Sequence, residues 1–180
     1  TGDYNIIMGH ASGAALTSGA SNIMIGQSAG TTATTAAQNV FIGAEAGYYA
    51  TTGTGNNVAI GTGAGKAITT GTLNTLVGAY AGDATTTVPN VNAFGYAALG
   101  VNITGQSLCA FGSYALDANT TANDNSAFGH VALSANTTGT GNNAFGSSSL
   151  DACTTGANNV AVGNNALGAL TTTNQNTAVG

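Results

Sequence analysis

Hydrophobic and polar residues recur along this chain with one fixed period. A glycine follows a large apolar residue eleven times, and nine of the ten intervals between these glycines are 17 residues long. The interval from Gly43 to Gly61 is 18 residues, and its extra residue falls within Thr54-Gly55-Asn56, where a loop would tolerate it. A fixed period of this kind predicts a repeat protein built from stacked units. The glycines are Gly9, Gly26, Gly43, Gly61, Gly78, Gly95, Gly112, Gly129, Gly146, Gly163 and Gly180.

Each unit, numbered from its glycine as position 0, has the same order of residue types. Position −4 is Asn in nine of eleven units, positions −2 and −1 are apolar, and +8 and +9 are usually Thr-Thr before a small residue. This order predicts a short strand ending at the glycine, a turn, a second short stretch, and a turn back. Seventeen residues suffice for one coil of a narrow solenoid but not for a helix-turn-helix unit. We therefore predict an all-β fold, a narrow parallel β-roll of about ten coils, with residues 1–180 as one array.

Two columns of equivalent residues carry specific structural expectations. Stacked coils place equivalent residues about 4.8 Å apart, and Asn side chains at that spacing can hydrogen-bond along a ladder. The predicted ladder is Asn5, Asn22, Asn39, Asn57, Asn74, Asn125, Asn142, Asn159 and Asn176. Side chains alternate across a strand, so −1 and −2 face opposite sides, and position −1 is predicted to fill the coil interior. The predicted core column includes Ile25, Ile42, Ile60, Phe94, Phe111, Phe128 and Phe145.

Position −2 is also apolar in every unit, and a strand that is apolar on both faces is usually buried on both. The second face therefore predicts a partner chain. Position +4 is Gly in the sub-block 5–90, mostly with a bulky −2 residue, and Leu in the sub-block 91–180, always with Ala at −2. This exchange of large and small residues predicts that −2 and +4 share one space. The unit at Gly61 is an exception, because Ala59 and Gly65 are both small.

Charge narrows the classes of partner. Charged residues make up 4% of the chain, the net charge is −5, and Lys66 is the only basic residue. Nucleic-acid binding requires a basic stripe, so it is not expected, and attraction to anionic membranes is excluded on the same ground. The sequence contains no run of 18 apolar residues, so membrane insertion is not predicted.

The sequence nominates no catalytic, cofactor-binding or metal-binding residues. His10 and His130 lie seven units apart, too far to share a metal ion, and are expected in exposed turns. Gly61–Lys66 lacks the spacing of a phosphate-binding loop and is one repeat unit in register. Cys109 and Cys153 are too far apart for a disulfide within one rod and are predicted to be free thiols.

Two further sets of polar residues recur in register. One set shares position +5 and is expected to be solvated rather than a calcium row, because the acidic Gly-rich nonapeptide of calcium-binding rolls is missing; it comprises Asp83, Asp117 and Asp151. The other set begins N-x-T sequons at +7 and is interpreted as a turn preference; it comprises Asn102, Asn119 and Asn136.

The units at residues 39–53 and 142–156 resemble the repeats of bacteriophage tail fibres. Residues 57–61, Asn-Val-Ala-Ile-Gly, are also similar to the head repeats of YadA-like trimeric autotransporter adhesins, whose units are usually shorter. This resemblance covers essentially the whole chain. It implies a homotrimeric, left-handed parallel β-roll on a virion tail fibre or bacterial surface. Such an extracellular segment would support or mediate attachment to a host surface glycan or protein.

Two alternatives from other classes stay open. The chain could form a self-assembling extracellular filament or sheath without a ligand. It could also be an ice-binding β-solenoid that uses its Thr-Thr column. If the Thr pair lay in a strand, however, the two side chains would face opposite ways and leave one column rather than a flat paired array.

Overall fold

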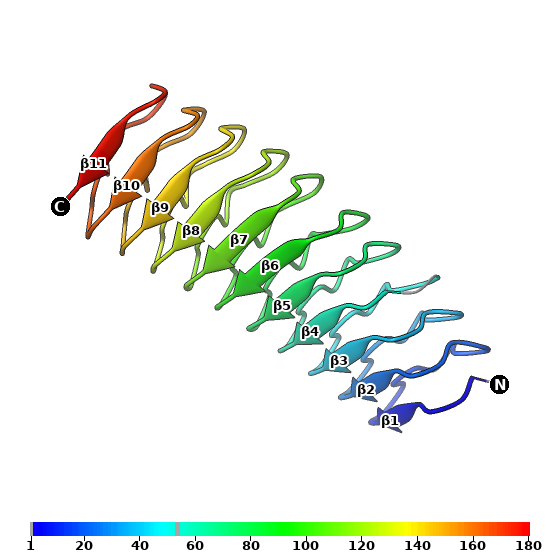
Figure 1. The fold of residues 1–180 in the computed structure, drawn as a ribbon. Helices are drawn as coiled ribbons and strands as arrows, with labels where there is room; N and C mark the ends of the chain where they lie inside the picture. The colour runs from blue at the N-terminus through cyan, green and yellow to red at the C-terminus, as the bar shows by residue number, and fades with distance from the viewer. Residues whose placement is uncertain (1, 53–54) are drawn as a thin grey trace.

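The structure, a computed structural model, describes residues 2–52 and 55–180. Thr54, one of the three residues to which the extra residue of the 18-residue interval was assigned, lies outside the described residues. The chain forms a parallel β-solenoid of about ten coils in which every strand pairs with the next one in sequence (Figure 1). Within the described ranges there is no helix. The all-β fold is therefore confirmed. The strands are β1 (Ile6–Met8), β2 (Ile23–Ile25), β3 (Val40–Ile42), β4 (Val58–Ile60), β5 (Thr75–Val77), β6 (Val91–Phe94), β7 (Leu108–Phe111), β8 (Ser126–Phe128), β9 (Asn143–Phe145), β10 (Val160–Val162) and β11 (Thr177–Val179).

Each coil stacks on the next in strict register. Ile42 of β3 pairs with Ile60 of β4, and the Gly43 amide donates to the Ile25 carbonyl at 2.8 Å. Gly43 follows its strand at φ +131°, and a Cβ there would lie 2.5 Å from the carbonyl oxygen of Gly61 in the next coil. Only glycine fits where stacked backbones come this close at positive φ. The recurring glycine therefore reflects the corner after each strand.

The structure corrects the prediction of which strand face lies inside. Position −2 points into the coil, where Phe41 and Ala110 are fully buried, whereas position −1 points outward and leaves Phe111 36% exposed. The interior is narrow, so it accepts a residue at −2 only when its size complements the returning arm of the same coil. Position −1 is large in every coil, and its size does not complement that of the returning arm, so it lies outside. The outward-facing residues wrongly placed in the core column are Ile25, Ile42, Ile60, Phe94, Phe111, Phe128 and Phe145.

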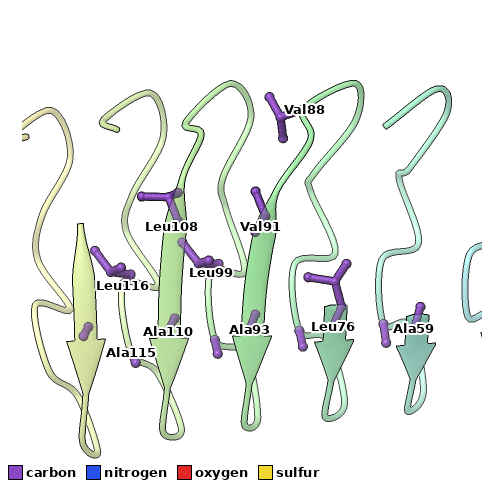
Figure 2. Close-up of a cluster of buried hydrophobic side chains, with 14 of the residues drawn as sticks. Ala59, Leu76, Val88, Val91, Ala93, Leu99, Leu108, Ala110, Ala115 and Leu116 are labelled. Carbon is purple, nitrogen blue, oxygen red and sulfur yellow. The ribbon is translucent and has the colours of Figure 1, made fainter. Parts of the chain in front are cut away.

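The predicted contact between positions −2 and +4 is confirmed, and it lies within one coil. A Cβ on Gly47 would lie 2.6 Å from the ring of Phe41, so the phenyl group occupies the space above this glycine. In the second sub-block, Figure 2 shows Leu116 on the returning arm, among the buried hydrophobic side chains of the interior. Leu116 is fully buried although its φ is +53°, a left-handed conformation that most residues avoid. Burial of the leucine offsets this backbone strain.

The exceptional coil after Gly61 fills its interior from a different position. Ala59 and Gly65 are both small, but Ile68 at +7 is only 1% exposed. A Cβ on Gly65 would lie 2.7 Å from Cδ1 of Ile68 and 2.9 Å from Cδ1 of Leu76 in the next coil. Ile68 therefore supplies the volume that Ala59 and Gly65 lack, as close packing requires.

The Asn residues at −4 lie inside the coil and form a hydrogen-bonded ladder. Oδ1 of Asn142 accepts from the backbone amide of Asn159 and from its Nδ2, both at 3.0 Å. Nδ2 of Asn142 donates to the Gly156 carbonyl at 2.8 Å, fourteen residues along the chain. Each amide group thus satisfies buried backbone groups in two coils. The carbonyl group fourteen residues along the chain also accepts from Nδ2 of Asn22, Asn57, Asn74, Asn125 and Asn159.

The ladder is interrupted where Val91 and Leu108 replace Asn at −4, and a second Asn ladder begins there. Nδ2 of Asn102, at +7, donates to the Gly105 carbonyl at 3.0 Å, fourteen residues after Val91. The carbonyl that an Asn at −4 would bind therefore receives its hydrogen bond from +7 instead. Asn119 does the same for the next coil and also donates to Oδ1 of Asn102 at 3.1 Å. A buried carbonyl without a donor costs about 1–3 kcal/mol, which explains why one Asn replaces the other.

Candidate functional site

The widest apolar surface is the outer face of the sheet, formed by positions −3 and −1 of β1 to β11. In β2 to β4 both positions are aliphatic, as with Ile23 and Ile25. From β6 to β9 the −1 residue is Phe and the −3 residue is polar or Cys, as with Asn143 and Phe145. Neither column contains a charged residue. Exposed apolar surface of this extent is typical of an interaction site.

Four phenyl rings stack along the second half of this face. The ring centroids of Phe94 and Phe111 are 4.4 Å apart, those of Phe111 and Phe128 are 4.9 Å apart, and those of Phe128 and Phe145 are 5.0 Å apart. The planes are within 13° of parallel. Stacking holds each ring in one orientation, so the phenyl strip is rigid before any partner arrives. A preorganised apolar strip loses little side-chain entropy on association.

The Thr-Thr columns lie on another surface of the rod, in bends rather than in strands. The premise that the Thr pair lies in a strand is therefore wrong. At +8 the hydroxyl is used within the rod, because Thr34 Oγ1 donates to the Thr51 carbonyl at 2.9 Å and Thr137 Oγ1 to the Thr154 carbonyl at 3.1 Å. At +9 the side chains are exposed in every described coil that has Thr there, as at Thr138.

One groove was not anticipated from the sequence. It has a volume of about 460 Å³ and includes three tyrosines from successive coils and two aspartates. Tyr96 lies at +1 whereas the other two tyrosines lie at +2, so column numbering hides the cluster. The groove, called the tyrosine groove below, is lined by Tyr80, Asp83, Ala84, Tyr96, Ala97, Gly100, Val101, Tyr114 and Asp117.

The titratable groups of the tyrosine groove are perturbed by their surroundings. Partial burial raises the pKa of both Asp83 and Asp117 above the ordinary value of 3.8, although nearby backbone amides act in the opposite direction. The pKa of Tyr114 is raised by its loss of solvent contact and by the neighbouring Tyr96 and Asp117. These two carboxyl groups are thus half-buried rather than fully solvated.

The two histidines, the two cysteines and Asp151 lie in different surroundings. His10 and His130 are exposed in turns, as predicted. Cys109 is free and half-buried at −3 on the outer face, whereas Cys153 is free and buried at +7. Burial raises the pKa of the Cys153 thiol. Asp151 lies at +5 but does not line the tyrosine groove.

Two sequence motifs have structural roles in the rod. The sequon residues Asn102, Asn119 and Asn136 are fully buried in the second Asn ladder, and each also donates to the carbonyl three residues on, across the following bend. In the segment that superficially resembles a phosphate loop, Lys66 Nζ contacts Glu45 Oε2 at 2.6 Å. Both side chains are about half exposed, so the pair contributes little to stability.

Residues 2–52 and 55–180 bring no three His, Cys, Asp or Glu side chains together as metal ligands. The same residues contain no helix with the length and apolar character of a membrane span. Comparison with protein-family models, curated proteins and solved structures found no match to the chain.

Proposed function

We propose that this chain is a repetitive segment of a homotrimeric, left-handed β-roll fibre that supports or mediates attachment to a host surface. The observation that carries the proposal is the uncharged outer face of β1 to β11, whose −1 column is apolar in every coil and half-buried to exposed along the rod. The resemblance to phage tail fibres and surface adhesins supports a place outside the cell. The proposed role is mechanical and adhesive rather than enzymatic.

A second copy of the same chain is the partner that best fits the outer face. Its apolar residues recur once per coil, so only a partner with the same axial repeat can match them along the whole length. A parallel copy has that repeat by construction. Three copies around one axis parallel to the rods form a closed symmetric assembly, with each outer face directed inward and the turns left on the outside.

The outer face contains apolar side chains and no charges, which favours association of identical chains. The −1 column has side chains as large as Phe128 in the second half and aliphatic residues such as Ile42 in the first. Because the columns lack charges, close approach of identical chains brings no like charges together within the interface. The outward-facing turns, rich in Thr, Asn and Ser, would keep the trimer soluble.

The stoichiometry of the chain in solution tests the proposal directly. Light scattering is expected to give about 52 kDa, three times the chain mass of 17.2 kDa. The triple variant Phe111→Ser, Phe128→Ser and Phe145→Ser is expected to dissociate toward 17.2 kDa. The matched control carries Ser at Thr121, Thr138 and Thr155 on the Thr surface, and it should keep the trimer mass.

The outcomes of this measurement separate the alternatives. A wild-type chain that stays monomeric at high concentration contradicts the fibre proposal, because its apolar face is then unpartnered. A mass that grows with concentration without a limit instead indicates the filament alternative, and electron microscopy would show end-to-end polymers. A stable dimer would keep the self-association but refute the threefold arrangement.

Ice binding is a second candidate, favoured by the exposed Thr column at +9. Because both Thr columns lie in a bend, neither is turned into the rod, and +9 offers a regular array of methyl and hydroxyl groups. A thermal-hysteresis assay decides this candidate. A freezing gap that is lost when Thr121, Thr138 and Thr155 are replaced by Tyr would support it, and a wild-type chain without any gap would refute it.

A further inference from the structure

The three tyrosines of the tyrosine groove are held at steep angles to one another. The ring centroids of Tyr80 and Tyr96 are 6.0 Å apart with planes at 87°, and those of Tyr96 and Tyr114 are 5.3 Å apart with planes at 71°. The rings therefore pack edge to face, with their planes in different directions, and all three line the groove. Each residue is 39–46% exposed, so the rings are accessible from solvent.

The groove exists because one position lacks a side chain. Asp83 and Asp117 share position +5 with Gly100, which lies in the coil between them. A Cβ placed on Gly100 would lie 3.7 Å from Oδ1 of Asp83, so a side chain there would extend into the space beside this carboxylate. At about 4.8 Å per coil the two aspartates are separated by roughly 10 Å along the rod. The gap is thus bounded by a carboxylate at each end.

Within residues 2–52 and 55–180, neither carboxylate forms an ion pair. Lys66 is the only basic residue of the chain, and its Nζ is paired with Glu45 at 2.6 Å. Partial burial raises the pKa of both aspartates, which indicates that their negative charge is incompletely compensated. A bound cation would stabilise the ionised carboxylates.

We propose that the tyrosine groove binds a quaternary ammonium group of the choline class. Crossed tyrosine rings attract a cation through their negative faces, and the two aspartates add favourable charge. A compact primary ammonium is strongly hydrated and needs hydrogen-bond acceptors on all sides. Walls formed by Ala84, Ala97 and Val101 instead suit the methyl groups of a weakly hydrated cation. The inference rests on the proposed function in one respect, that an attachment segment contacts groups displayed on a surface.

The groups that face the ligand also predict how binding depends on pH. Asp83 and Asp117 must be ionised to attract the cation, whereas Tyr114, with its raised pKa, stays neutral at ordinary pH. Lys66 acts on Asp83 in the opposite sense, since its charge favours the ionised carboxyl. Affinity for choline is therefore expected to fall as the pH is lowered through the raised aspartate pKa values.

Titration of the full chain with choline, followed by calorimetry and by tyrosine fluorescence, tests the proposal. The chain has six Tyr and no Trp, so tyrosine emission is directly readable. Tyr96→Leu removes a central ring and Asp117→Asn removes one charge at nearly constant shape. Each is expected to weaken binding by about tenfold. The matched control is Asp151→Asn, in the same column but outside the groove, which should bind choline as the wild type does.

Control ligands test whether binding depends on the positive charge of choline. The neutral carbon isostere of choline, with a tert-butyl group in place of trimethylammonium, should bind at least about tenfold more weakly. Equal binding of this isostere, preference for a neutral monosaccharide, or no binding at millimolar choline would each overturn the proposal. Light scattering on the same samples keeps the two proposals separable, because a monomer that binds choline refutes only the trimer and a trimer that ignores choline refutes only this site.

Discussion

Exchanging the sizes of Phe41 and Gly47 tests the packing of the rod interior. Phe41 is fully buried, so Phe41→Ala is expected to cost about 3–5 kcal/mol of unfolding free energy. Gly47 has φ +56°, and a Cβ there would already lie 2.6 Å from the Phe41 ring. Gly47→Leu alone should therefore cost about 1–3 kcal/mol for overpacking and about 1–2 kcal/mol for the left-handed backbone.

The two changes together should largely compensate each other. The double variant recreates the pair seen at Ala110 and Leu116, where Leu is fully buried at φ +53°. Only the backbone strain of about 1–2 kcal/mol should remain, so the coupling between the two sites should be about 4 kcal/mol or more, above the usual range for contacting residues.

Urea unfolding followed by circular dichroism measures this effect. All variants must be compared at one chain concentration, because association shifts apparent stability, and by transition midpoint, because long repeat arrays depart from two-state behaviour. The expected order is wild type, then the double variant, then both single variants. The control pair Phe111→Ala with Gly47→Leu should be additive, since the two residues lie on opposite sides of the strand layer. A Phe41 and Gly47 double variant less stable than either single variant would refute the shared-space interpretation.

Three further outcomes are expected. Asn142→Ala should lower the urea midpoint strongly, by about 1–3 kcal/mol for each buried group left unpaired, whereas Asn164→Ala at an exposed turn should have little effect. Cys153, whose thiol pKa is raised by burial, should resist alkylation in the native chain and react only after unfolding, as mass spectrometry would show; alkylation as fast as that of Cys109 would contradict its buried position. The pKa of Asp117 is raised in the folded chain, so ionisation of this carboxyl group opposes folding. Its contribution to the free energy of unfolding therefore falls as the pH rises from the ordinary pKa of 3.8 through the raised pKa. Asp117→Asn should therefore be at least as stable as wild type at neutral pH, with a smaller difference in acid, by urea midpoints measured across pH.

The period and strand register could be predicted from the sequence because they depend on backbone requirements that only certain residues meet. Gly43 and its equivalents occupy a corner that excludes a Cβ, so the period is visible as a spacing of glycines. Which face lies inside could not be taken from hydrophobicity, since Phe41 and Ile42 are both apolar. The deciding signal was complementary size, because position −2 becomes small where +4 becomes large, whereas position −1 is large in every coil.

The tyrosine groove was harder to foresee for a related reason. Its walls combine positions +1, +2, +5 and +6 of several coils, so no single column identifies it. Its floor depends on Gly100, where the informative feature is a missing side chain between two aspartates. The sequence signal for this coil is Gly100, which interrupts the +5 column between Asp83 and Asp117.

The strict coil-to-coil register also determines how the rod responds to a pulling force. Hydrogen bonds such as that from the Gly43 amide to the Ile25 carbonyl run along the rod axis, so tension on the ends acts directly on the bonds that join one coil to the next. When a terminal coil detaches, its 17 residues can extend to about 56–61 Å in place of a rise of about 4.8 Å. Each rupture therefore lengthens the rod by roughly 50 Å and leaves the remaining coils intact. Under load the rod would yield in equal steps from its ends, dissipating work gradually instead of breaking at once.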